Sequence, residues 1–352
     1  MLAPIVASFY IVVGNSLLEI LAEYRGFEQP PLAIRCALLA LAALVYLIVH
    51  ESGHRMAGVF MGWKCTAFGI GPLEFFRERN LWKHRRVKML WGAFVRQMPP
   101  NFCRFRPQKA LTLTSGPLAS LIVGGLLLVI VLDTQNATVF ALVSRLALVI
   151  LLGLFELIPA CRKGIGSDGY RLRQVLRGGP ELDEMYRDML GEASNHCFVR
   201  YRDWPREALV RMASGDDPYS IYLAYLHMLD SGDVEAASSY MRRLIASLPE
   251  GEASPFYAYE AAYWLAEYEG DVAAAKRWLE RAASDESNVV RVQAEAAIAA
   301  AEAQWERASA LVQRGLALAH DPGECGGDQV DVERLNKILS TAPVGEAAVT
   351  GA

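Results

Sequence analysis

Four long runs of apolar residues constrain this chain more than any other feature of its sequence. They cover about residues 2–22, 31–60, 111–132 and 137–159. A helix needs roughly 20 apolar residues to cross a bilayer, and each run reaches that length. The first run is the weakest because it includes Asn15 and Glu19. We therefore predict a mostly α-helical, polytopic transmembrane bundle of four spans within residues 1–169.

The distribution of charge predicts how this bundle is oriented. Residues 1–169 carry 17 Lys and Arg against 9 Asp and Glu, whereas residues 170–352 carry 18 against 30. Within the basic half, residues 63–109 hold 11 basic and 2 acidic side chains. Short basic loops stay on the cytosolic side of a membrane. We therefore expect the chain to lie in the inner or plasma membrane of a cell, with both termini in the cytosol. Because the basic excess lies between apolar segments, it indicates contact with the lipid bilayer and not with nucleic acid.

The basic loop also carries a signal for β-structure. The stretches "CTAFGIGPLEFF" and "RRVKMLWGAFVRQMP" are rich in aromatic and β-branched residues, and Gly69, Gly71 and Pro72 interrupt the first of them. Such patterns are typical of short strands joined by turns. We expect a small β region at the membrane surface within residues 63–109.

A metal-binding pattern lies at the end of the second apolar run. His50-Glu51-Ser52-Gly53-His54 reads H-E-x-x-H, and residues four apart share one face of a helix. Two such imidazoles can bind one tetrahedral Zn²⁺, while Glu51 lies beside the open coordination position and can take a proton from water there. Ionisable residues within a span are costly and usually functional. The alternative is that they are interfacial residues at a helix end.

A site of this kind needs a third protein ligand, and the candidates follow the fourth span. The segment "LGLFELIPACRKGIGSDGYRL" contains Glu156 and Asp168. The orientation derived from the basic loop places the ends of spans two and four on the same side of the membrane. Asp168 can therefore approach His50 and His54, and Glu156 is an alternative ligand.

Three stretches of the sequence resemble a known family. "HESGHRMAGVFMG", "SGPLAS" and "ELIPACRKGIGSDG" are similar to segments of the site-2 protease family of intramembrane metalloproteases, over about residues 31–175. The resemblance implies that His50, His54 and Asp168 bind zinc and that Glu51 is catalytic. The chain departs from the family where Glu156 replaces an asparagine, and we expect Glu156 to be a protonated acid or a partner of a histidine. The nine positions from Pro159 to Asp168 exceed the spacing common in the family.

The acidic half contains an internal repeat. "SGDVEAASSYMRRL" (231–244), "EGDVAAAKRWLERA" (269–282) and "AQWERASALVQRGL" (303–316) follow one another at intervals of 38 and then 33 residues. These intervals bracket the period of about 34 residues of a tetratricopeptide repeat. At the matching positions of the first two copies we expect Gly232 and Gly270 to end one helix and Asp233 and Asp271 to begin the next. We predict a helical linker over 170–214, a cytosolic domain of tetratricopeptide-like helical hairpins over 215–320 and a partly disordered tail over 321–352.

Together these features predict an intramembrane zinc endopeptidase that cleaves a transmembrane helix, such as that of a single-span membrane protein, near the cytosolic face. The concave face of a helical repeat array is suited to docking a cytosolic protein or peptide. The alternative for the repeats is a stabilising cap on the membrane core. The alternative for the whole chain is a non-catalytic, membrane-anchored helical-repeat adaptor with a vestigial zinc site.

Overall fold

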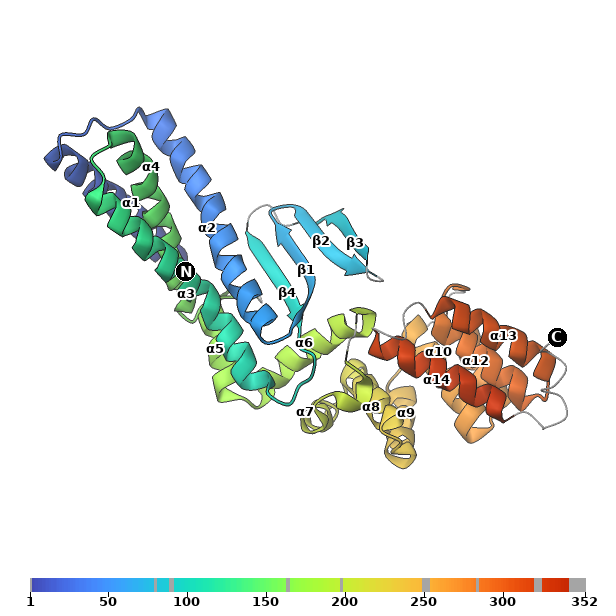
Figure 1. Ribbon diagram of the computed structural model, residues 1–352. Helices are drawn as coiled ribbons and strands as arrows, with labels where there is room; N and C mark the ends of the chain where they lie inside the picture. The colour runs from blue at the N-terminus through green and yellow to red at the C-terminus, as the bar shows by residue number, and fades with distance from the viewer. Residues whose placement is uncertain are drawn as a thin grey trace. The chain divides into compact units, whose positions relative to one another are not determined.

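The structure is a computed structural model that describes residues 2–78, 81–88, 92–162, 165–196, 199–248, 254–282, 285–319 and 325–341 (Figure 1). The chain divides into two compact units, Met1–Leu182 and Asp183–Ala352. Each unit is described by itself.

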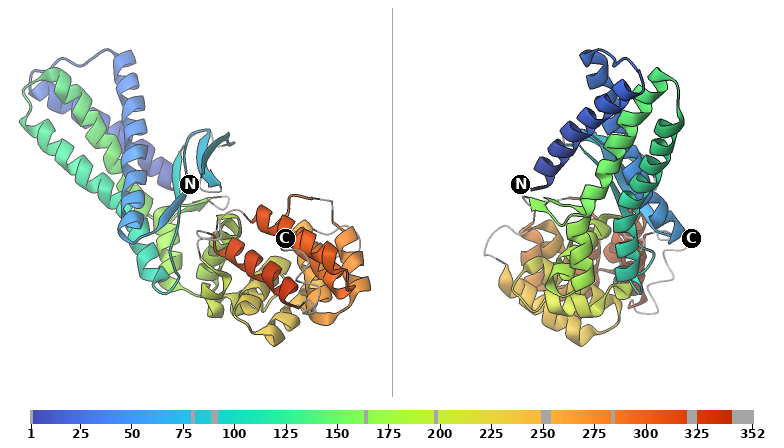
Figure 2. Two further views of the ribbon diagram at one scale, coloured as in Figure 1. Left: turned by 45° about the vertical axis from the view of Figure 1, so that its right-hand side comes forward. Right: turned by 90° about the vertical axis from the view of Figure 1, so that its left-hand side faces the viewer.

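Long helices form most of the first unit. They are α1 (Leu2–Tyr24), α2 (Leu32–Phe60), α3 (Phe105–Asp133) and α4 (Ala137–Leu151), and a 3₁₀ segment, η1 (Leu152–Leu157), continues α4. Figures 1 and 2 show α2, α3 and α4 side by side. Within the described residues, three helical segments are long and apolar enough to cross a membrane: α2, α3 and Ala137–Leu157. The helix α1 is present, but a fourth span stays a prediction.

A short, well-capped turn joins α3 to α4. Arg25 donates hydrogen bonds through Nη1 to the carbonyls of Val131 (3.0 Å) and Thr134 (3.1 Å), which occupies two acceptors at the end of α3. Asn136 is the N-cap of α4, and its Oδ1 accepts from the backbone N–H groups of the second and third residues that follow it. Side chains therefore satisfy the backbone at this turn.

The β region predicted for residues 63–109 is a four-stranded antiparallel sheet. Its strands are β1 (Lys64–Ile70), β2 (Leu73–Glu78), β3 (Leu81–Arg86) and β4 (Ala93–Met98), in the spatial order β3-β2-β1-β4. Phe68 of β1 pairs with Phe75 of β2 and with Val95 of β4. The turn after β1 has Gly71 at a positive φ of 53°, which glycine adopts without strain. The edge strand β4 packs beside α2.

A short segment of small elements follows η1. Strands β5 (Cys161–Arg162) and β6 (Ile165–Gly166) form a two-stranded hairpin that leads into α5 (Asp168–Arg177). Arg106 of α3 holds the end of α5, since its Nη2 donates to the carbonyl of Leu176 (2.9 Å). Gly178 and Gly179 then join α5 to α6 (Pro180–His196), with φ values of 73° and 67°.

Helices also build the second unit. They are η2 (Tyr201–Asp203), α7 (Arg206–Met212), α8 (Pro218–Asp230), α9 (Val234–Ser247), α10 (Pro255–Trp264) with its π-helical extension η3 (Leu265–Glu269), α11 (Val272–Glu280), α12 (Val289–Ala301), α13 (Trp305–Leu318) and α14 (Gly326–Ser340). The pairs α8/α9, α10/α11 and α12/α13 pack as successive helical hairpins. Their relation to tetratricopeptide repeats stays a prediction. The helix α14 lies in the predicted tail, whose last residues, 342–352, fall outside the described part of the chain.

The caps expected in the first two repeats are confirmed, but the third repeat differs. Gly232 and Gly270 have left-handed φ values of 79° and 68°, and the Asp after each accepts a hydrogen bond from the backbone N–H three residues later. At the corresponding place before α13, Ala303 has a φ of 59°. Its Cβ makes this conformation unfavourable. The third repeat therefore uses the same turn without the residue best suited to it.

Replacing Ala303 with Gly should raise the free energy of unfolding of the second unit by about 1 kcal/mol, because the left-handed conformation no longer meets a Cβ. Gly270→Ala is the matched reverse change and should lower the same quantity by a similar amount. Urea titrations of the purified chain, with amide hydrogen exchange in α12 and α13, measure both. An Ala303→Gly chain less stable than wild type would contradict this explanation.

Candidate metal centre

Helix α2 carries the three residues of the H-E-x-x-H pattern toward its C-terminal end, which we predict to face the cytosol. His50 and His54 lie one helical turn apart, and their Nε2 atoms are 3.2 Å from each other. The side chain of His50 is 7% exposed and that of His54 is 13% exposed. Both rings are thus fixed within the fold rather than extended into solvent, which argues against free interfacial histidines.

Asp168, which follows the hairpin β5/β6 in the chain, lies beside the two histidines. It is the first residue of α5, whose N-cap is Ser167. The Ser167 hydroxyl donates to the carbonyl of Ile158 (2.7 Å) and accepts from the N–H of Ala160 (3.0 Å), so it fastens the end of η1 to the start of α5. The hairpin accounts for the long spacing between Pro159 and Asp168. The additional residues fold back on themselves and return the carboxylate to the histidines.

Three donor atoms converge at this point. Asp168 Oδ2 lies 3.0 Å from His50 Nε2 and 3.1 Å from His54 Nε2. Nitrogen and oxygen ligands about 2.0–2.1 Å from a tetrahedral zinc ion are roughly 3.3 Å apart. The spacing of the three atoms therefore fits one small metal ion, and their chemistry, two imidazoles and a carboxylate, suits zinc.

The second nitrogen of each imidazole has a partner on α3. His54 Nδ1 lies 2.6 Å from the carbonyl of Thr112, and because a carbonyl only accepts, Nδ1 donates and leaves Nε2 free to bind a metal. Ser120 Oγ is 3.5 Å from His50 Nδ1. These contacts orient both rings toward Asp168. Neither Thr112 nor Ser120 was singled out from the sequence as a site residue, although Ser120 ends the stretch "SGPLAS".

The charge state of Asp168 suits a metal ligand. Burial alone raises the pKa of its carboxyl, but the two imidazoles beside it lower it by more, so that the net pKa lies well below the usual range. Asp168 therefore stays ionised at neutral pH. An ionised carboxylate is the form that binds a cation.

Glu156 does not join the three donor atoms. Within the described part of the chain, the group whose ligand atoms all lie within 4.8 Å of one another consists of His50, His54 and Asp168. Glu156 lies in η1, the segment that leads to Asp168. This geometry gives no support to Glu156 as the third ligand, and its role as a partner of a histidine stays a prediction.

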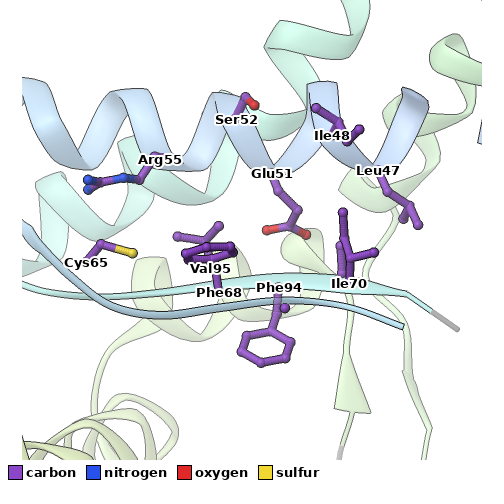
Figure 3. Close-up of a pocket in the computed structure, with 12 residues that line it drawn as sticks. Leu47, Ile48, Glu51, Ser52, Arg55, Cys65, Phe68, Ile70, Phe94 and Val95 are labelled. Atoms are coloured by element: carbon purple, nitrogen blue, oxygen red, sulfur yellow. The ribbon is translucent and has the colours of Figure 1, made fainter. Parts of the chain in front are cut away.

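Glu51, which follows His50 on α2, opens on a cavity. The cavity, of about 240 Å³, lies between α2 and the sheet, and Figure 3 shows the Glu51 carboxylate pointing from α2 toward the strands. Its other walls are mainly apolar, with Leu47, Ile48, Phe68 and Ile70 among them. A peptide segment placed here would have its backbone beside Glu51.

Gln97 of β4 fastens the sheet to the metal-binding helix. Its Nε2 donates to the backbone carbonyl of His54 (2.9 Å). Gly58, one turn further along α2, leaves room for this contact, because a Cβ there would lie 1.7 Å from Gln97 Oε1. No sequence pattern marked Gln97, since a lone glutamine in a basic loop has no distinctive spacing.

Comparison with known proteins agrees with this geometry. A family model described as peptidase family M50 matches residues 37–337, most of the chain. The chain belongs to peptidase family M50. Members of this family are typically zinc-dependent intramembrane metalloproteases, so a role as a membrane metalloprotease is supported. Neither the curated proteins nor the solved structures yielded a match.

Gly116 of α3 should be essential for metal binding because it makes room for the His54 ring. A Cβ at this position would lie 2.4 Å from His54 Nε2. Gly116→Ala should therefore displace the ring and weaken zinc binding about tenfold or more. Zinc content and competitive chelation of the purified protein measure the effect. Gly125→Ala on the same helix, where a Cβ meets nothing within 4 Å, is the control, and equal zinc affinity in the two variants would contradict the prediction.

Proposed function

We propose that this chain is an intramembrane zinc endopeptidase that cleaves a transmembrane helix of another membrane protein near the cytosolic face. One observation carries the proposal. His50 Nε2, His54 Nε2 and Asp168 Oδ2 converge within about 3 Å, and Glu51, on the same helix as the two histidines, opens on a cavity. A structural metal site would have no use for a carboxylate placed in this way.

The roles of the residues follow from their positions. His50, His54 and Asp168 would hold the zinc ion, which when bound lowers the pKa of water and polarises a peptide carbonyl. Glu51 would remove a proton from the attacking water. It would then pass that proton to the amine nitrogen of the cleaved bond. The apolar walls around Glu51 would limit the access of bulk water.

We infer that the substrate binds in an extended form along β4. A helical substrate has its backbone amides closed in hydrogen bonds, so it must unwind locally before cleavage. β4 is an edge strand beside α2, and Val95 of β4 lines the same cavity as Glu51. A strand added to this edge would be paired along its backbone next to Glu51. A crosslinking scan that found no contact between substrate and β4 would exclude this arrangement.

The remaining parts of the proposal concern location and partners. The excess of Lys and Arg in 63–109 supports an inner or plasma membrane protein with both termini in the cytosol. The second unit would then be cytosolic, where its helical hairpins would dock the substrate or another protein. The substrate itself would be a membrane protein, such as one with a single span.

Glu51→Gln is the direct test of the protease. We expect cleavage of a single-span substrate to fall by roughly 10²–10⁴-fold, because the amide cannot accept the proton, while zinc content stays at the wild-type level. His54→Ala and Asp168→Ala should instead lose zinc. Substrate cleavage in vesicles and metal analysis of the same preparations measure both properties.

The same experiment separates the enzyme from the adaptor. A chain lacking residues 200–352 is compared with the Glu51→Gln variant. Full function in Glu51→Gln, lost only on deletion of 200–352, would favour an adaptor with a vestigial site and refute the protease.

The cavity beside Glu51 should select the substrate side chain next to the cleaved bond. Ile70→Ala widens its apolar wall, so we expect cleavage of substrates with Phe at that position to improve about tenfold relative to those with Val. Competition among single-span substrates that differ only at this residue gives the ratio. Ile122→Ala, an exposed apolar residue of α3 away from the cavity, is the control. An unchanged ratio in Ile70→Ala would mean that this cavity does not bind the side chain.

A further inference from the structure

The last described helix, α14, covers an internal surface of the second unit. It packs against α12 and α13, and its side chains also reach α10 (Figure 1). Leu335 is fully buried beside Gly315 of α13, where a Cβ on the glycine would lie 2.9 Å from the leucine side chain. Val330 and Ile338 are buried on the same side of α14. We call the surface that α14 covers the α14 seat, and define it by Glu260, Tyr263, Gln293 and Gly315.

A buried ion pair anchors α14 in this seat. Arg334 Nη1 donates to Glu260 Oε1 at 2.9 Å and to Oε2 at 3.2 Å, and the side chains are 7% and 2% exposed. Glu260 also accepts from the Tyr225 hydroxyl at 3.0 Å, and the Arg334 guanidinium lies 5.2 Å from the centre of the Tyr263 ring. Glu260 therefore makes the seat selective for a cation at this point.

More exposed contacts also hold α14, at its middle and near its end. Arg200, which precedes the helical hairpins, donates to Glu333 at 2.6 Å. Lys337 lies 3.0 Å from Glu267 at the end of η3. α14 thus contacts more than one hairpin, as a bound helical peptide would.

Some buried polar groups at the contact between α14 and its seat are poorly satisfied. Among the described residues, Arg334 Nε and Nη2, Gln293 Oε1 and the Tyr263 hydroxyl are buried without a hydrogen-bond partner. Burial also raises the pKa of the Asp331 carboxyl to about 6, so that an ionised group is held there at neutral pH at a cost. Unpartnered buried polar atoms weaken association. These groups lower the stability of the contact between α14 and its seat.

We propose that the α14 seat is a helix-binding site which α14 occupies intramolecularly, and that an amphipathic partner helix with an arginine in its apolar face replaces it. The pattern that the seat recognises is read from α14. Apolar residues at the positions of Val330 and Ile338 flank an arginine at the position of Arg334, four residues from each. Glu260 supplies the specificity, because a partner without the cation leaves this carboxylate buried and unpaired.

This inference rests on the docking role proposed for the second unit and names the chemistry of the partner. It does not depend on the protease. Peptide binding tests the seat, whereas Glu51→Gln tests the cleavage. Failure of either leaves the other standing.

The experiment uses the full chain in detergent and a labelled peptide of residues 326–341. Arg334→Glu in the chain should release its own α14 and free the seat. The peptide should then bind about tenfold tighter or more than to the wild type, in which the seat is occupied. Amide exchange should accelerate in α14 while α8–α13 stay protected. Asn336→Glu, an exposed position on the same helix, should behave as wild type.

A charge swap completes the test. In Arg334→Glu combined with Glu260→Arg, α14 should be protected again and the peptide should no longer bind. The proposal is wrong if α14 stays protected in Arg334→Glu, or if it is released and the peptide does not bind. It is also wrong if the whole second unit loses protection in Arg334→Glu, since α14 would then be a fixed part of its core.

Discussion

The close approach of α2 and α3 is the constraint on which the metal centre depends. Gly53 brings α2 so near to α3 that a Cβ would lie 2.4 Å from the carbonyl of Ser115, and Gly116 leaves space for the His54 ring. At this separation the Thr112 carbonyl and the Ser120 hydroxyl can reach the two imidazoles. Small residues permit close packing of helices in lipid, where the hydrophobic effect does not drive association. The geometry of the three donors is thus a consequence of helix packing.

The sheet forms one wall of the cavity at Glu51. It presents an apolar face with Phe68, Phe75 and Trp82 in ring contact, while on its other face the buried Glu74 pairs with the exposed Arg85 and Arg96. The apolar face lines the cavity beside Glu51. Polar pairing on one face and aromatic contact on the other hold the strands together.

Local patterns in the sequence were sufficient for much of this arrangement. The length of the apolar runs predicted α2, α3 and α4, and residue spacing predicted that His50 and His54 share one face of a helix. The charge of the loops predicted that Asp168 lies on the same side of the membrane as these histidines. What the sequence did not reveal depends on long-range contacts. The bond from Gln97 to the His54 carbonyl and the pair of Arg334 with Glu260 join residues 43 and 74 positions apart, with no periodicity to mark them. The hairpin β5/β6 was visible only as an unusual spacing.

The glycine pair between α5 and α6 has a structural consequence. Helix α5, which begins with Asp168, is fastened at its start by Ser167 and at its end by Arg106, whereas Gly178 and Gly179 beyond it are in left-handed conformations with few steric limits on rotation. An L-residue with a side chain at either position would be strained, so the connection between α5 and α6 depends on glycine.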